Sequence, residues 1–161
     1  MSRAWFQTLS IAALVLGAGA AEAQTKAVRP PTRTAVRPAA TPQSFTCVED
    51  AFTMCLNGGR FEVFAIFDTP QGASGDAEMV RLTDDSGYMW FFSSPNIEAV
   101  VKVVNGCAIS PAYWFFAGGL TNVHVVITVT DSITGVSRQW ENPQNTAFQP
   151  IQNTSALDVC P

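Results

Sequence analysis

Histidine is nearly absent from the 161-residue sequence, which has a single one, at position 124. Sites that need several histidines, such as the H-E-x-x-H zinc motif, are therefore excluded. The P-loop, the dinucleotide-binding G-x-G-x-x-G pattern and the G-x-S-x-G nucleophile elbow are missing as well. His124 lies inside a run with strand-like alternation, and we interpret it as an ordinary strand residue. The lack of a catalytic motif favours a protein that is not an enzyme.

Basic residues are scarce from position 44 onward. Residues 44–161 contain twelve acidic and four basic side chains, a net charge of −8, whereas the whole chain carries −4. Such a surface repels nucleic acid and anionic membranes, so we expect neither as a partner. It suits a cation or a basic partner, although acidic residues also serve solubility alone.

Long apolar runs are confined to the N-terminus. Residues 1–23 combine Arg3, an uncharged stretch with its apolar centre at 9–16, and the tripeptide at 21–23, which is Ala-Glu-Ala. This order is typical of a secretory signal peptide that is cleaved after Ala23. The alternative is a membrane anchor, but a spanning helix needs about 20 well-apolar residues. We therefore expect a secreted or periplasmic protein with no membrane span after signal cleavage.

Acidic residues are missing from 24–43, which contain four prolines and four basic residues. Proline removes backbone donors and favours an extended chain, so we interpret this stretch as a disordered linker. The alternative is a basic arm that binds anionic cell-wall polymer or lipid headgroups.

Helix signals are few in residues 44–161, whereas runs with strand-like alternation are many. The residues at 61, 63, 65 and 67 are apolar, as are those at 123, 125, 127 and 129. Turn-forming Asp, Asn, Ser and Gly residues separate the runs. We expect strands at 61–68, 78–83, 88–93, 98–104, 112–116, 123–130 and 135–140. The pattern predicts one all-β domain, an antiparallel β-sandwich of immunoglobulin-like type, with a jelly roll or small barrel as the alternative.

Four cysteines, an even number in a chain expected to be exported, indicate two disulfides. We favour Cys47–Cys55, which closes a short loop, and Cys107–Cys160, which fastens the C-terminal residues. The competing arrangement joins Cys47 to Cys160 and Cys55 to Cys107. A zinc site is disfavoured because no C-x-x-C pair is present.

Five carboxylates, Asp68, Asp76, Glu78, Asp84 and Asp85, fall within eighteen positions. Loop carboxylates such as Asp76, Asp84 and Asp85 are weak candidates for calcium ligands, and the group could also supply the acid and base of a hydrolase. Neither use has a diagnostic spacing here, and aspartates at 84 and 85 are also common in turns. We therefore expect no cofactor, with calcium as the alternative.

Large aromatic residues are concentrated in two predicted strands, 88–92 and 113–116. Tyr88, Trp90, Tyr113 and Trp114 are the candidate binding residues among them. Rings that face inward fill the core, whereas rings exposed on a sheet can stack on sugars or anchor a protein partner.

A series of short runs between Cys55 and Cys160 resembles a family of exported bacterial β domains. The runs are LNGGRF at 56–61, DSGYMWFF at 85–92, NIE at 96–98, VKV at 101–103, NGC at 105–107, WFFAGGLT at 114–121, TVTD at 128–131 and TG at 134–135. The chain departs from the pattern at Met89, where the family tends to have an aromatic residue. The resemblance implies secretion and a small β domain, and it implies no reaction, ligand or functional residue.

Three functions remain open on these grounds. We expect first an exported, non-enzymatic binding module that contacts a protein or a carbohydrate through exposed aromatic residues. The alternatives are a secreted hydrolase that uses the carboxylates of the 68–85 region and a purely structural accessory domain.

Overall fold

The computed structural model describes residues 44–161, and the predicted signal peptide (1–23) and linker (24–43) lie outside the described residues. Strands are the only regular elements in the described range. They are β1 (Met54–Leu56), β2 (Phe61–Asp68), β3 (Ser74–Asp76), β4 (Glu78–Arg81), β5 (Ser86–Trp90), β6 (Ala99–Asn105), β7 (Tyr113–Gly119), β8 (His124–Asp131), β9 (Ser137–Asn142) and β10 (Ile151–Leu157). No helix in this range is long and apolar enough to cross a membrane.

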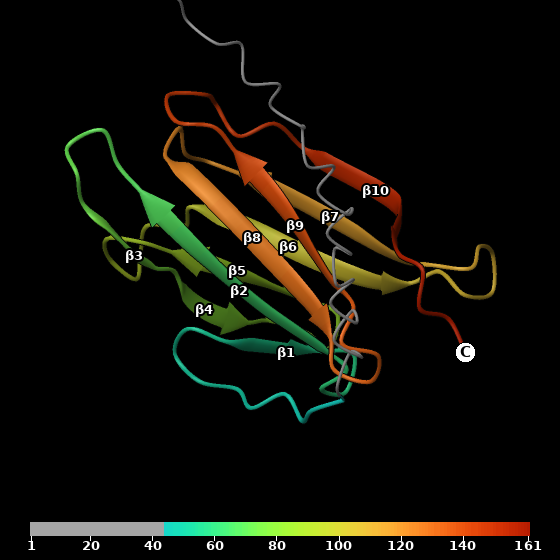
Figure 1. Ribbon diagram of the computed structural model, residues 1–161. Coiled ribbons are helices and arrows are strands. Elements are labelled where there is room, and N and C mark those ends of the chain that lie inside the picture. The colour runs from blue at the N-terminus through green and yellow to red at the C-terminus, as the bar shows by residue number, and fades with distance from the viewer. Residues whose placement is uncertain (1–43) are drawn as a thin grey trace, which may run out of the picture. The chain divides into compact units, whose positions relative to one another are not determined.

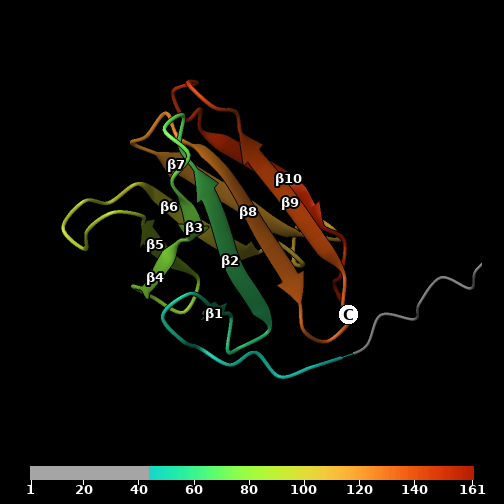
Figure 2. The ribbon, with the colours of Figure 1, turned by 60° about the vertical axis from the view of Figure 1, so that its left-hand side comes forward.

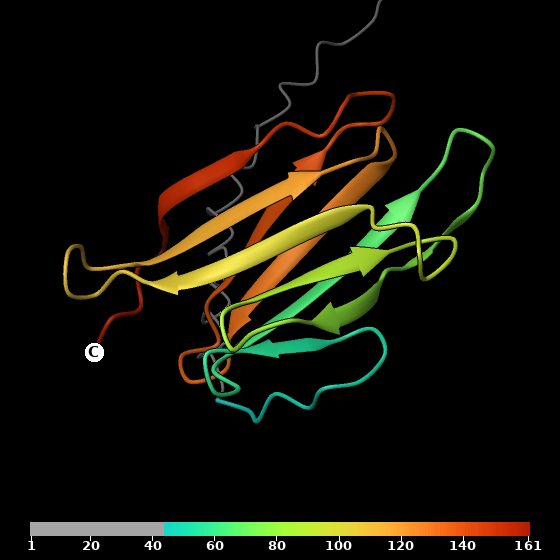
Figure 3. The same cartoon turned by 180° about the vertical axis from the view of Figure 1, so that it is seen from behind.

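Two antiparallel sheets pack face to face and form the predicted sandwich (Figure 1). Sheet A has the order β1-β2-β8-β9, with β3 also paired to β2. Sheet B has the order β10-β7-β6-β5-β4. Figure 2 shows β2, β8 and β9 in one layer in front of β5, β6 and β7, and Figure 3 turns sheet B toward the viewer.

The strand order confirms the sandwich but not the immunoglobulin-like arrangement. Strands β4 to β7 are consecutive neighbours in one sheet, whereas an immunoglobulin domain divides its successive strands differently between its sheets. Within residues 44–161 the two sheets remain separate ladders, so the small-barrel alternative is not supported.

The core follows the period-two pattern of the sequence. In β2 the residues at 61, 63, 65 and 67 are buried, and they lie beside a matching buried row of the neighbouring strand β8 at 125, 127 and 129. Sheet B contributes the inward residues of β5, β6 and β7, among them Met89, Val101 and Phe115. The Phe115 ring stacks on Trp140 of β9 at 3.8 Å between centroids, which joins the two sheets.

Three strands lie outside the predicted runs. All three residues of β1 are buried and all three of β3 are exposed, so neither strand alternates. The edge strand β10 is mostly polar, and its position depends on pairing with β7 rather than on an apolar face. These strands form because a partner ladder is available, which is a tertiary cause.

The favoured cysteine pairing is confirmed. Cys47 bonds to Cys55 and Cys107 bonds to Cys160, so the competing arrangement is wrong. Two disulfides indicate an oxidising compartment, such as the periplasm or the extracellular space. Near the C-terminus, the Arg60 guanidinium donates to the carbonyl of Val159, the residue before Cys160.

Candidate functional site

The candidate aromatic residues do not form one surface. Tyr113 faces inward and is only 6% exposed, with its ring 4.7 Å from that of Phe61 and beneath the Arg60 guanidinium. It is therefore a core residue, and its burial does not favour the predicted ligand contact.

Trp114 lies on the opposite face of β7 but is held by the protein itself. Its Nε1 donates a 2.8 Å hydrogen bond to Oγ of Ser110. A Cβ on Gly106 would lie 2.2 Å from the same Nε1, so the indole packs directly on that glycine. Its polar atom is already used, which fits a structural role better than ligand contact.

Tyr88 and Trp90 are half-buried on the outer face of sheet B, the face turned away from sheet A. Tyr88 pairs with Val80 on one side and with Val100 on the other, and Val100 pairs in turn with Gly118. This row crosses four strands and places Tyr88 beside an apolar surface in which Val100 is 47% exposed.

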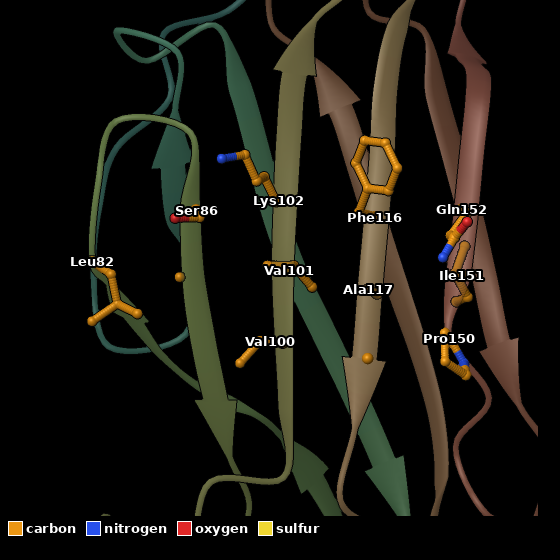
Figure 4. Close-up of a pocket in the computed structure, with 12 residues that line it drawn as sticks. Leu82, Ser86, Val100, Val101, Lys102, Phe116, Ala117, Pro150, Ile151 and Gln152 are labelled. Carbon is orange, nitrogen blue, oxygen red and sulfur yellow. The ribbon is translucent and has the colours of Figure 1, made fainter.

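An apolar depression of about 380 Å³ lies on this face, and we call it the outer groove (Figure 4). Its walls come from β5, β6, β7, β10 and the turn after β4, and these four strands are successive neighbours in sheet B. The main lining side chains are Leu82, Val100, Lys102, Phe116, Pro150 and Ile151.

Gly118 contributes only backbone to the lining of the outer groove. A Cβ built on Gly118 meets no atom within 4 Å, whereas one on neighbouring Gly119 would lie 2.4 Å from Cγ of Phe148. The φ of Gly118 is not positive, so its backbone does not require glycine either. Neither steric crowding nor a positive φ therefore explains glycine at this position. A glycine within a strand often marks a place where a ligand or another chain approaches closely.

One edge of the outer groove carries a charge pair. The Lys102 ammonium lies 3.0 Å from Oδ2 of Asp85. The Thr83 hydroxyl donates a 2.6 Å hydrogen bond to Oδ1 of Asp85, and this bond is the main reason why the pKa of Asp85 is lowered. The hydrogen bond from Lys102 lowers it further. Asp85 is thus a turn residue with internal partners.

The weak calcium candidates are not gathered. Asp76 lies in the exposed strand β3, and Oδ1 of Asp84 accepts a 2.8 Å hydrogen bond from the N–H of Gly58. Within residues 44–161 no group of three or more His, Cys, Asp or Glu side chains is arranged to hold a metal ion. The carboxylates of the 68–85 region are therefore not gathered into one metal site in the described residues.

His124 has partners that the sequence did not indicate. Its Nδ1 lies 2.5 Å from Oδ2 of Asp68 on β2, and its Nε2 lies 3.1 Å from Oε1 of Glu141 on β9. The hydrogen bond to Asp68 raises the pKa of His124, and the hydrogen bond to Glu141 adds to this rise. Partial burial of the imidazole opposes the rise but does not cancel it. With a carboxylate at each nitrogen, the imidazolium form is favoured and neither nitrogen remains to act as a base. Asp68 lies directly opposite His124 in the pairing of β2 with β8. The sequence alone does not reveal this, because the register of the two strands has to be known first.

Comparison of the chain with protein-family models, with curated proteins and with solved structures finds no match.

Proposed function

We propose that the protein is an exported binding module that takes up an apolar side chain of a protein partner in the outer groove. The observation that carries this proposal is the open backbone of Gly118 beneath an apolar depression. The lining is mainly aliphatic, with Phe116 as its one aromatic ring, and this suits an apolar side chain better than a sugar face. Signal-peptide cleavage after Ala23 and secretion or residence in the periplasm belong to the same proposal.

Peptide display against the full mature chain tests the proposal. Peptides enriched on the wild-type protein should share an apolar residue, because one side chain fills the groove. Gly118→Leu places a side chain in the same space, and it should lower the affinity of these peptides at least about tenfold. Since no protein atom lies within 4 Å of the new Cβ, the fold should be retained.

Val126→Leu is the matched control, because it adds apolar bulk to the outer face of sheet A instead. Peptides that bind wild type and Gly118→Leu equally well would overturn the proposal. So would a selection that enriches no peptide at all.

A carbohydrate ligand is the second candidate, and it rests on Tyr88 and Trp90, two half-exposed rings on one face of β5. A glycan array with the wild-type chain and with Tyr88→Ala and Trp90→Ala separates it from the first. Binding of a glycan that both ring variants abolish and Gly118→Leu leaves intact would favour carbohydrate recognition.

A further inference from the structure

Glu98, just before β6, is a buried carboxylate with little internal support. Glu98 as a whole residue is only 4% exposed. Oε1 accepts a hydrogen bond from Nδ2 of Asn96, and no donor within residues 44–161 reaches Oε2. Oε2 is not among the fully enclosed side-chain atoms that lack a partner, so it keeps some access to solvent.

Glu98 also has no cationic partner in the described part of the chain. All four basic residues there, and the histidine, have other partners. These are Arg60 with Asp131, Arg81 with Glu49, Lys102 with Asp85, His124 with Asp68 and Glu141, and Arg138 with the carbonyl of Ser137. Buried charges are normally paired, because removing an ion from water is costly without a counter-charge. A cation on a binding partner would supply the counter-charge that Glu98 lacks within the domain.

Glu98 lines a depression of about 560 Å³ at one end of the sandwich. The same depression is lined by the half-exposed ring of Phe92, by Leu120 and by Phe148, which offer apolar and aromatic surface around the carboxylate. A ring face attracts an ammonium group as well, and residues 44–161 carry a net charge of −8.

This end depression and the outer groove each share lining residues with a third hollow. Gly119, Leu120 and Phe148 also line a smaller hollow of about 320 Å³, and that hollow shares Val100, Gly118 and Pro150 with the outer groove. Gly118 and Glu98 therefore line neighbouring depressions of one surface.

We propose that Glu98 binds the ammonium group of a lysine side chain of the partner, while the apolar stem of that lysine lies against Leu120 and Phe148. This inference rests on the proposed function, since it assigns the anionic end of the same surface. The carboxylate specifies a cation, and the apolar walls select a cation on a hydrocarbon stem over an inorganic ion.

Hexylammonium chloride is a suitable probe, because it carries a charged amine on an apolar stem at neutral pH. Titration into the full mature chain, followed by amide chemical shifts, should move the signals of Asn96, Glu98 and Leu120. Hexanol and sodium hexanoate are the matched probes, and both should bind at least about tenfold more weakly than hexylammonium. This comparison uses the wild-type chain alone and does not depend on any variant folding.

Glu98→Gln keeps the shape of the side chain and removes the charge. It should lower hexylammonium affinity about tenfold and leave hexanol binding unchanged. Glu62→Gln, the same substitution on the outer face of β2, should change neither. Equal binding of hexylammonium and hexanol, no binding of hexylammonium, or equal affinity of wild type and Glu98→Gln would each overturn the inference.

The two proposals fail separately. If Glu98→Gln has no effect while Gly118→Leu abolishes peptide binding, only the lysine assignment is wrong. If hexylammonium binds at Glu98 while Gly118→Leu leaves every selected peptide bound, only the outer groove is wrongly assigned.

Discussion

The Arg60 guanidinium and the Asp131 carboxylate form a two-point pair at one end of the sandwich, where Arg60 precedes β2 and Asp131 ends β8. Nε lies 3.0 Å from Oδ1 and Nη2 lies 3.3 Å from Oδ2, and the Asp131 side chain is fully buried. Burial by itself opposes ionisation of Asp131, but Arg60, the Thr134 hydroxyl and the N–H of Ile133 outweigh it and lower the pKa. The same guanidinium donates to the Tyr113 hydroxyl. Arg60 therefore links the end of β8, the start of β7 and, through the Val159 carbonyl, the C-terminal residues.

Arg60→Met should destabilise the fold by about 3–5 kcal/mol, because it leaves Asp131 buried without its counter-charge. The measurement is urea unfolding at neutral pH. Arg81→Met removes the exposed pair with Glu49, in which both side chains are 44% exposed, and should cost less than about 1 kcal/mol. Equal losses in the two variants would contradict this view of the Arg60 pair.

Stability should depend on pH through His124. Its pKa is raised in the folded state by the hydrogen bonds to Asp68 and Glu141, so the stabilisation is fully present below the ordinary value of 6.5 and is lost as the pH rises through the raised pKa. The difference in unfolding free energy between wild type and His124→Gln should therefore shrink from about pH 5 to about pH 9. A difference that stays constant or grows with pH would count against the ion-pair assignment.

The sheet architecture was largely readable from alternation, whereas the direction of the aromatic residues was not. The run at 61–68 alternates apolar and polar residues, so its buried side is evident. In β7 both sides are aromatic, Tyr113 and Phe115 on one and Trp114 and Phe116 on the other, and period two alone cannot say which pair faces the core. The packing of β2 and β9 against one side decides it.

The candidate site was less predictable, because its parts depend on tertiary neighbours. The outer groove needs β10, which has no apolar face, and the open position of Gly118 is known only when its surroundings are known. Glu98 stands at the start of a predicted strand like any surface residue. Its lack of a counter-charge emerges only after every cation in residues 44–161 has been assigned a partner.

The disulfides should contribute unequally to stability. Chain entropy grows with loop length, and the two bonds span sequence separations of 8 and 53 residues. Replacing Cys107 and Cys160 together by serine should cost up to about 4 kcal/mol, against about 2.5 kcal/mol for Cys47 and Cys55. Chemical denaturation of the two double variants gives the comparison. A larger loss for the shorter loop would mean that packing around Cys47–Cys55, and not loop closure, dominates.

Adjacent glycines should respond oppositely to the same substitution. Gly118→Ala adds a Cβ to open space and reduces the freedom of the unfolded chain, so stability should stay level or rise by about 0.4–1 kcal/mol. Gly119→Ala drives a Cβ against the Phe148 ring and should cost about 1–3 kcal/mol. Thermal unfolding of both variants tests this. A loss in Gly118→Ala equal to that in Gly119→Ala would contradict the open space around the Gly118 Cβ.

Glu98→Gln should leave the protein as stable as wild type or more stable, by up to about 1 kcal/mol at neutral pH. The amide can still accept the hydrogen bond from Asn96, and the cost of a buried charge without a counter-charge disappears. A binding residue is often retained at such a cost to stability. Urea unfolding of Glu98→Gln beside Glu62→Gln provides the measurement, since Glu62 is half-exposed on β2 and its substitution should have little effect. If Glu98→Gln instead lost several kcal/mol, the carboxylate would have to be satisfied within the fold, and it would not be held ready for a lysine of the partner.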